Sequence, residues 1–180
     1  KDAADTDGDG FSNYDELVIH ESDPTDANNY PTRTLSAEAA TNGLITFAAT
    51  HKLGATATAT AVPDLGYLFT AWTGADTGAD NPLTLTMDAN KTIGATFTRD
   101  TVDTDGDGFS NYDELVIHGT DPTAANSYPT HEITIIGDFH GKGRINGNFI
   151  TYKKGATATL TAYANEAYVF NGWSGPVQSQ

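Results

Sequence analysis

The sequence predicts a mainly β fold organised as a tandem repeat, in which small β modules, such as β-sandwiches, alternate with short acidic connectors. Two observations predict it. The sixteen residues DTDGDGFSNYDELVIH occur unchanged at residues 5–20 and at residues 103–118. After each copy the sequence changes to short alternating runs such as TATATA, which are typical of strands with two unlike faces. Because self-similarity at a fixed period marks a repeat architecture, the chain is best divided by its period.

This period divides the 180 residues into four segments. The first connector covers residues 1–31 and the first β module residues 32–99. The second connector covers residues 100–129 and the second β module residues 130–180. The connectors match at an offset of 98 and the modules, from residue 54 onward, at 101, which predicts a net insertion of three residues in a hairpin region. The second module lacks a counterpart of residues 81–97, so we expect it to be truncated or completed by strands from another chain.

The elements follow from local pattern. In the first module we expect about six short strands, at residues 34–38, 44–48, 55–61, 67–72, 83–87 and 92–97, separated by Gly-, Pro- and Asn-rich breakers. No helix is expected before either acidic loop. A short helix is expected after each one, and in the first copy it runs from residue 13 to about residue 20. Its apolar face contains Tyr14, Leu17 and Val18, and Asp23-Pro24 follows its end.

Composition excludes several classes of function. Asp and Glu number 24 against 9 Lys and Arg, a formal net charge of −15, which argues against nucleic acid and anionic membrane surfaces as partners. There is no Cys, so disulfides and zinc–thiolate sites are impossible. No apolar run approaches the roughly 18 residues of a membrane span, so we expect no direct membrane insertion. The chain begins at Lys1 without Met or a signal peptide and is expected to be an excerpt or a processed product.

The repeated segment matches the twelve-residue loop pattern D-x-[DN]-x-[DN]-G-x₅-E in both copies. Calcium takes six to eight oxygen ligands, and alternate residues of a tight loop can direct theirs at one point. The glycine at the sixth position permits the positive φ that reverses the chain. We therefore expect two calcium sites. The expected ligands are Asp5, Asp7, Asp9, Phe11, Asn13 and Glu16 in the first, and Asp103, Asp105, Asp107, Phe109, Asn111 and Glu114 in the second.

These residues have different expected roles. Phe11 should contribute its backbone carbonyl while its ring enters the core, Asn13 should bind directly or through water, and Glu16 should close the site with both oxygens. The alternative is a solvated acidic turn capped by Ser12 and Asp15, but four carboxylates around one point repel one another without a cation. Whether Asp2, Asp23, Asp100 or Asp121 add ligands stays open. The loops are solitary, which favours a structural site over an opening-and-closing sensor.

The residues DTDGDGFSNYDELVIHGTDPT resemble the cysteine-free, bacterial form of the thrombospondin type 3 repeat. The first module, with PDLGYLFTAWTG and then NPLTLTMDANKTIGATF, resembles the divergent internalin-type B-repeats of bacterial surface proteins. That second resemblance implies a small β domain, often β-grasp-like, used as a spacer or adhesion module. The second copy departs from it by replacing Gly66 with Ala167 and by ending early.

No pattern in the chain predicts catalysis. The five histidines share no metal or catalytic spacing, and His20 and His118 are expected at the surface near helix ends. The aromatic residues are expected to form module cores, with sugar stacking as the alternative; they are Tyr67, Phe69, Trp72, Tyr168, Phe170 and Trp173. The alternating threonines resemble those of ice-binding strands, but one such strand per module is too few for an ordered array.

We therefore expect a non-enzymatic, calcium-binding structural repeat that rigidifies an extracellular stalk, spacer or adhesin on or outside a bacterial cell. Its partners would be calcium, neighbouring repeats or identical chains, and glycans or other surface proteins. Two alternatives stay open. In one, the chain is a subunit of an extracellular filament in which a partner's strands complete the second module. In the other, it is a carbohydrate-binding or adhesive module of a larger secreted enzyme.

Overall fold

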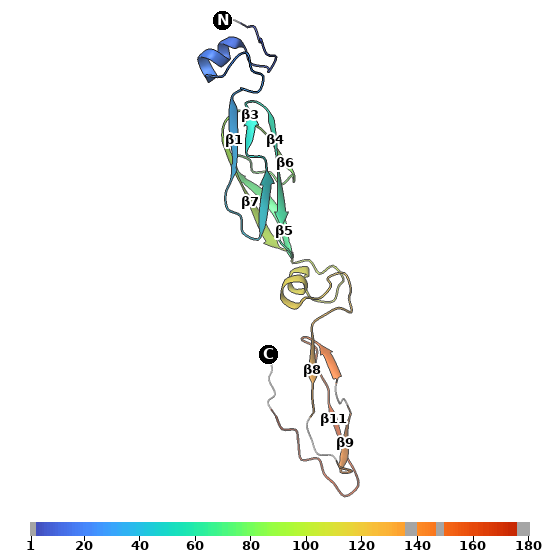
Figure 1. Cartoon of the computed structure of the whole chain (residues 1–180). Helices are drawn as coiled ribbons and strands as arrows, with labels where there is room; N and C mark the ends of the chain where they lie inside the picture. Colours follow the sequence, from blue (N-terminus) through green and yellow to red (C-terminus); the bar gives the residue numbers. More distant parts are fainter. Residues whose placement is uncertain (1–2, 136–139, 147–149, 176–180) are drawn as a thin grey trace.

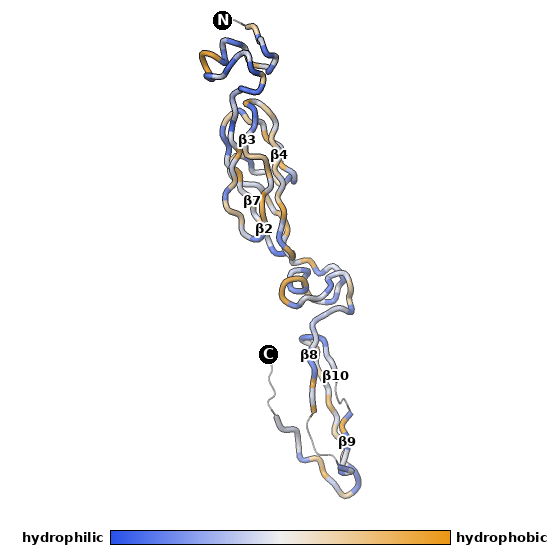
Figure 2. Tube along the Cα trace, viewed as in Figure 1, coloured by the Kyte–Doolittle hydropathy of each residue, from blue (hydrophilic) through white to orange (hydrophobic). Residues whose placement is uncertain are grey.

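The structure is a computed structural model that describes residues 3–135, 140–146 and 150–175. The molecule is elongated, and connector, module, connector and module follow one another along its length (Figure 1). Within these described residues, eleven strands lie in small sheets, which confirms the mainly β prediction. Figure 2 shows that hydrophobic residues gather along the strands of the first module and at the helix of each connector.

The first module is a sandwich of two sheets. Its strands are β1 (Thr32–Ala37), β2 (Gly43–Phe47), β3 (Thr50–Lys52), β4 (Thr56–Pro63), β5 (Tyr67–Gly74), β6 (Leu83–Thr86) and β7 (Lys91–Arg99). One sheet has the order β3-β1-β7-β5 and the other the order β2-β4-β6. Strands β1 and β7 pair in parallel, and the other pairings are antiparallel. The sequence missed β3, whose three residues are too few to show an alternating pattern.

The hydrophobic core lies between the two sheets and draws on both. The TATATA run turns its alanines inward and its threonines outward, as the alternation predicts, so β4 lies close against the opposite sheet. Trp72 on β5 is 1% exposed, and its indole N–H donates to the carbonyl of Asp80 at 2.8 Å. The buried core residues are Leu35, Ala57, Ala59, Ala61, Trp72, Leu83, Leu85, Met87, Ile93 and Phe97.

The second module contains β8 (Thr130–Ile133), β9 (Gly143–Asn146), β10 (Ile150–Lys153) and β11 (Thr161–Ala164). These pair as β8 with β10 and β9 with β11, which repeats the pairing of β1 with β3 and β2 with β4. The aromatic residues that correspond to β5 belong to no strand here. Tyr168, Phe170 and Trp173 are about half exposed, so the prediction that they form a core is right for the first module and wrong for the second.

Each connector contains one short helix after its acidic loop. The segment is helical from residue 13 to residue 20, as predicted, and η1 (Asp15–His20) is wound as a π-helix. Its counterpart in the second connector is η2 (Asp113–His118). The helices end where Glu21 and Gly119 adopt the left-handed conformation, before the Asp-Pro pair is reached.

Candidate metal centre

The acidic loop is shaped by its own aspartates. The backbone N–H groups of Gly8 and Gly10 donate to the two carboxylate oxygens of Asp5, at 2.8 and 2.9 Å. The N–H of Asp9 donates to Asp7 Oδ1 at 3.1 Å, and the N–H of Phe11 donates to Asp9 Oδ1 at 2.8 Å. These short-range bonds wind the backbone round the carboxylates, and Gly10 has the positive φ, +96°, that the tight loop requires.

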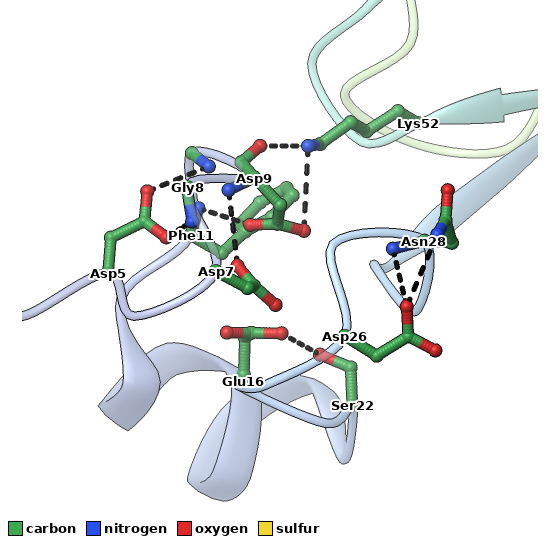
Figure 3. A network of polar contacts seen from close by, with 11 residues as sticks. Asp5, Asp7, Gly8, Asp9, Phe11, Glu16, Ser22, Asp26, Asn28 and Lys52 are labelled. Atoms are coloured by element: carbon green, nitrogen blue, oxygen red, sulfur yellow. Dashed lines mark hydrogen bonds and ion pairs between the residues drawn. The ribbon is translucent and has the colours of Figure 1, made fainter.

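The winding brings three carboxylates together. Asp5, Asp7 and Asp9 each offer an oxygen, and these atoms all lie within 4.8 Å of one another. Glu16, from the first turn of the helix, directs its carboxylate toward that of Asp7 (Figure 3). Glu16 is fully buried, and Ser22 Oγ donates to its Oε1 at 3.1 Å. The loop and the helix therefore converge on one point from two sides.

Several of these oxygens accept no hydrogen bond within the described part of the chain. Asp7 Oδ2, Asp9 Oδ2 and Glu16 Oε2 are buried and accept no hydrogen bond from any described residue. Burying an unpaired carboxylate oxygen is costly, and native proteins rarely leave one so. A cation at the point where these atoms meet would satisfy all of them. An all-oxygen donor set of this kind suits calcium in particular.

The electrostatics agree with this interpretation. Burial raises the pKa of Glu16 above its usual range, and the charges of Asp7, Asp9 and Asp5 raise it further against the hydrogen bond from Ser22. By contrast, the N–H of Gly10 is the largest cause that lowers the pKa of Asp5. A carboxyl whose folded pKa is raised stabilises the fold only while it is protonated, and that contribution is lost as the pH rises through the folded pKa. Above that pKa the ionised Glu16 therefore opposes folding unless a cation compensates.

The second copy repeats the geometry. Oxygens of Asp103, Asp105 and Asp107 lie within 4.8 Å of one another, and Glu114 is fully buried. Thr120 takes the place of Ser22 and donates to Glu114 Oε1 at 3.1 Å. The buried oxygens without a partner are again the equivalent atoms, Asp105 Oδ2, Asp107 Oδ2 and Glu114 Oε2. Burial is likewise the first cause that raises the pKa of Glu114.

Other expected ligands are engaged elsewhere. The side-chain oxygen of Asn13 accepts the N–H of Thr6 at 3.0 Å, and its amide donates to Thr6 Oγ1 at 2.8 Å. Asn111 makes the same contact with the N–H of Thr104 and also donates to Asp100 Oδ2 at 2.9 Å. In this geometry the two asparagines hold the loop closed.

Four further aspartates were left open as ligands, and those that the structure describes also accept hydrogen bonds within or next to the connectors. Asp23 Oδ1 accepts the N–H and the hydroxyl of Thr25, at 3.0 and 2.7 Å, and Asp121 makes the same turn with Thr123. Both carboxylates therefore stabilise the turn that follows the helix. Asp100 accepts the N–H of Val102 at 3.1 Å. Asp2 lies outside the described residues.

Two expectations about surroundings are wrong. The ring of Phe11 does not enter the module core but meets the imidazole of His20 edge-on, with centroids 5.6 Å apart. Phe109 and His118 form the same pair at 5.7 Å. The two histidines are therefore half-buried against phenylalanine rings and are not free surface residues.

Sequence reasoning missed a lysine that reaches each loop from the module that follows. Lys52, at the end of β3, donates to the backbone carbonyl of Asp9, and its Nζ lies 3.5 Å from Asp9 Oδ2 (Figure 3). The same ammonium lies over the rings of Phe11 and Tyr30, at 5.1 and 4.6 Å from their centroids. Lys153 repeats the arrangement with Asp107, Phe109 and Tyr128. The available signal was a lysine two residues before each Gly-Ala-Thr-Ala-Thr run.

The second connector also contacts the module that precedes it. The ring of Tyr112 meets that of Tyr67 edge-on at 5.3 Å, and the Arg99 guanidinium lies over Tyr112 at 4.5 Å. A side-chain hydrogen bond with Tyr67 raises the pKa of Tyr112. The N–H of Asp100 donates to the carbonyl of Gly66 at 2.9 Å. We call this contact the seam; it joins the turn between β4 and β5 to the second connector.

Comparison with known families assigns both parts of the repeat. The divergent InlB B-repeat domain matches residues 33–101 and 119–179, which together make up well over half of the chain. The chain belongs to this family. The bacterial TSP3 repeat matches residues 5–27 and 103–125, so each divergent InlB B-repeat is preceded by a segment similar to a TSP3 repeat. No curated protein and no solved structure matches the chain.

The matches confirm both resemblances predicted from the sequence. The TSP3-like segments coincide with the two acidic loops and their helices, and the divergent InlB B-repeats coincide with the β modules. Repeats of these two kinds indicate an extracellular structural repeat of a bacterial surface protein. Within the described residues, no helix has both the length and the apolar character needed to cross a membrane.

Proposed function

We propose that this divergent InlB B-repeat protein is a calcium-stabilised structural repeat, which holds successive β modules in line as part of a stalk, spacer or adhesin. The observation that carries the proposal is the set of buried oxygens on Asp7, Asp9 and Glu16 that accept no hydrogen bond from any described residue, which recurs at the equivalent atoms of the second loop. An enzyme would need a general acid, base or nucleophile, whereas these carboxylates would be engaged by the ion.

The position of each loop explains what the ion would do. Lys52 and Lys153 tie the loops to the modules that follow, and the seam ties the second connector to the module before it. An ion that orders a connector would therefore also fix the angle between two modules. With a dissociation constant of about 10⁻⁴ M and about 1 mM calcium outside the cell, mass action supplies about 1.4 kcal/mol per site. That is modest for one joint and adds up along an array.

Calorimetric titration with calcium tests the proposal, combined with melting curves of the calcium-free and calcium-loaded protein. We expect two equivalents to bind and the melting temperature to rise. Glu16→Gln and Glu114→Gln should each remove one equivalent. Asp15→Asn is the matched control, because it removes the same charge one residue away from Glu16, at a carboxylate that is engaged by Ser12 Oγ at 2.9 Å. Absence of binding at millimolar calcium would refute the calcium-binding role.

A second candidate function is suggested by the second module. Tyr168, Phe170 and Trp173 are about half exposed, and the first two help line a pocket of about 190 Å³ beside β9 and β11. Their equivalents in the first module lie on β5, which pairs along its length with β7. A strand resembling Lys91–Arg99, supplied by a second chain, would cover them and link subunits into a filament.

Sedimentation at increasing protein concentration tests this second candidate. Assembly that depends on concentration and is abolished by replacing Tyr168 and Phe170 with Ser would support it. A chain that stays monomeric at every concentration would contradict it. The Glu16→Gln and Glu114→Gln variants separate this outcome from calcium binding, because they leave the aromatic residues unchanged.

A further inference from the structure

The two connectors share sixteen identical residues but differ in what lies beside them. In the first connector, Leu17 and Val18 are 62% and 61% exposed. In the second, the equivalent Leu115 is half-buried and Val116 is 45% exposed. Because these residues are the same, the difference in exposure reflects the neighbours of each copy. The apolar stretch of the first helix lies at the outer edge of its connector in Figure 2.

The neighbour that covers the second copy is the end of the first module. A Cβ built on Gly66 would lie 2.6 Å from Val116 Cγ2 and 3.3 Å from Tyr112 Cδ2, so this turn sits directly on the helix face. Gly66 also has φ +77°, which a side chain rarely adopts. The seam is therefore built on a glycine for two reasons, the backbone conformation and the close approach of the helix.

The negative charge of the first connector favours a β-module end that carries a cation as the neighbour of its helix. Residues 2–31 contain no Lys or Arg but nine Asp and Glu, so the connector is strongly acidic. The module end that covers the second connector presents a cation, Arg99, over the ring of Tyr112. A module end with an arginine or lysine at this place, and a glycine in its turn, complements the acidic connector in both charge and shape.

From these contacts we infer that the face formed by Tyr14, Leu17 and Val18 is a docking surface for the glycine turn of another β module, joined directly ahead of the first connector as residues 32–99 are joined to the second. The equivalent turn in the second module contains Ala167, with φ +70°. Its Cβ would meet a docked helix where Gly66 leaves room, so that turn does not fit an identical connector in the same pose. A seam of this kind therefore accepts a module whose turn has glycine at this position and excludes one whose turn has alanine.

Thiol reactivity tests the inference, because the chain has no cysteine of its own. Leu17→Cys and Leu115→Cys are compared in the full chain, and we expect Leu17→Cys to react faster with a soluble disulfide reagent. Ile19→Cys and Ile117→Cys are the matched control pair, since Ile19 and Ile117 are 54% and 57% exposed and should react alike. Equal rates for the two leucine positions would show that the first module does not cover the second helix, and no further variant would be needed to overturn the inference.

The decisive step extends the full chain with a copy of residues 32–98 placed before Lys1, the residue that aligns with Arg99. The rate at Leu17→Cys should fall to that of Leu115→Cys. Gly66→Ala in the added copy alone should restore the faster rate. A rate at Leu17→Cys that stays high in the extended chain would overturn the inference. Both rates are measured with calcium and with chelator, so that loss of calcium binding at the acidic loops is distinguished from failure of docking.

Discussion

The ammonium nitrogen of Lys52 lies 3.5 Å from Asp9 Oδ2, and that of Lys153 lies 3.6 Å from Asp107 Oδ2. Each lysine belongs to a β module, and each aspartate oxygen is buried without a hydrogen-bond partner among the described residues. At each proposed site, one of the oxygens that would coordinate the ion therefore also pairs with the following module. Connector and module meet at the candidate metal centre itself.

The first prediction follows from this shared oxygen. Lys52→Met removes a positive charge beside Asp9 Oδ2 while keeping most of the length of the side chain. Because the ammonium and a calcium ion compete for the same carboxylate, calcium affinity at the first site should rise, on the order of threefold. Calorimetric titration measures it. Lys91→Met is the control, since Lys91 pairs with Asp88 at 2.9 Å in a different part of the module. A weaker first site would mean that Lys52 preorganises the loop more than it repels the ion.

The second prediction concerns the hydroxyl that orients Glu16. Ser22 Oγ donates to Glu16 Oε1 at 3.1 Å, and Ser22→Ala leaves that oxygen without its donor. Residues that orient metal ligands matter nearly as much as the ligands, so calcium affinity at this site should fall by roughly tenfold. Thr25→Val provides the comparison in the same connector, because the hydroxyl of Thr25 donates to Asp23 Oδ1 and not to Glu16. An unchanged affinity in Ser22→Ala would show that Glu16 is oriented by the helix alone.

The third prediction isolates the close contact at the seam. Gly66→Ala and Gly54→Ala both place a side chain at a positive φ, +77° and +80°, and should both lose on the order of 1 kcal/mol of unfolding free energy from backbone strain. Of these two positions, only at position 66 would the added Cβ meet another atom within 4 Å. Gly66→Ala should therefore be the more destabilising of the two in urea unfolding, and Val116→Ala in its background should recover part of the difference. Equal losses of unfolding free energy for the two variants would show that the helix does not contact the turn at position 66.

These contacts also show why the sequence predicted some features and missed others. The loop could be predicted because its spacing is local: within the first loop, the side chains of Asp5, Asp7, Asp9 and Asn13 bond to residues at most seven positions away. The alternation of β4 is equally local. Lys52 acts on Asp9 across 43 residues, and no motif encodes such a distance. The difference between Leu17 and Leu115 is invisible in principle, since identical residues acquire it from their neighbours.

The last prediction uses the two tryptophans, which report on the two modules separately. Trp72 is 1% exposed and Trp173 is 49% exposed, so acrylamide should quench the emission of Trp173 and spare that of Trp72. Trp173→Phe should leave only blue-shifted emission that resists quenching, and subtracting it from the spectrum of the native chain gives Trp173 alone. The variant should fold normally, because the residue it changes makes few buried contacts. If Trp173 in the native chain resists quenching at high protein concentration and becomes accessible on dilution, then a second chain covers it. Strand completion between chains would then explain the second module better than a monomeric spacer does.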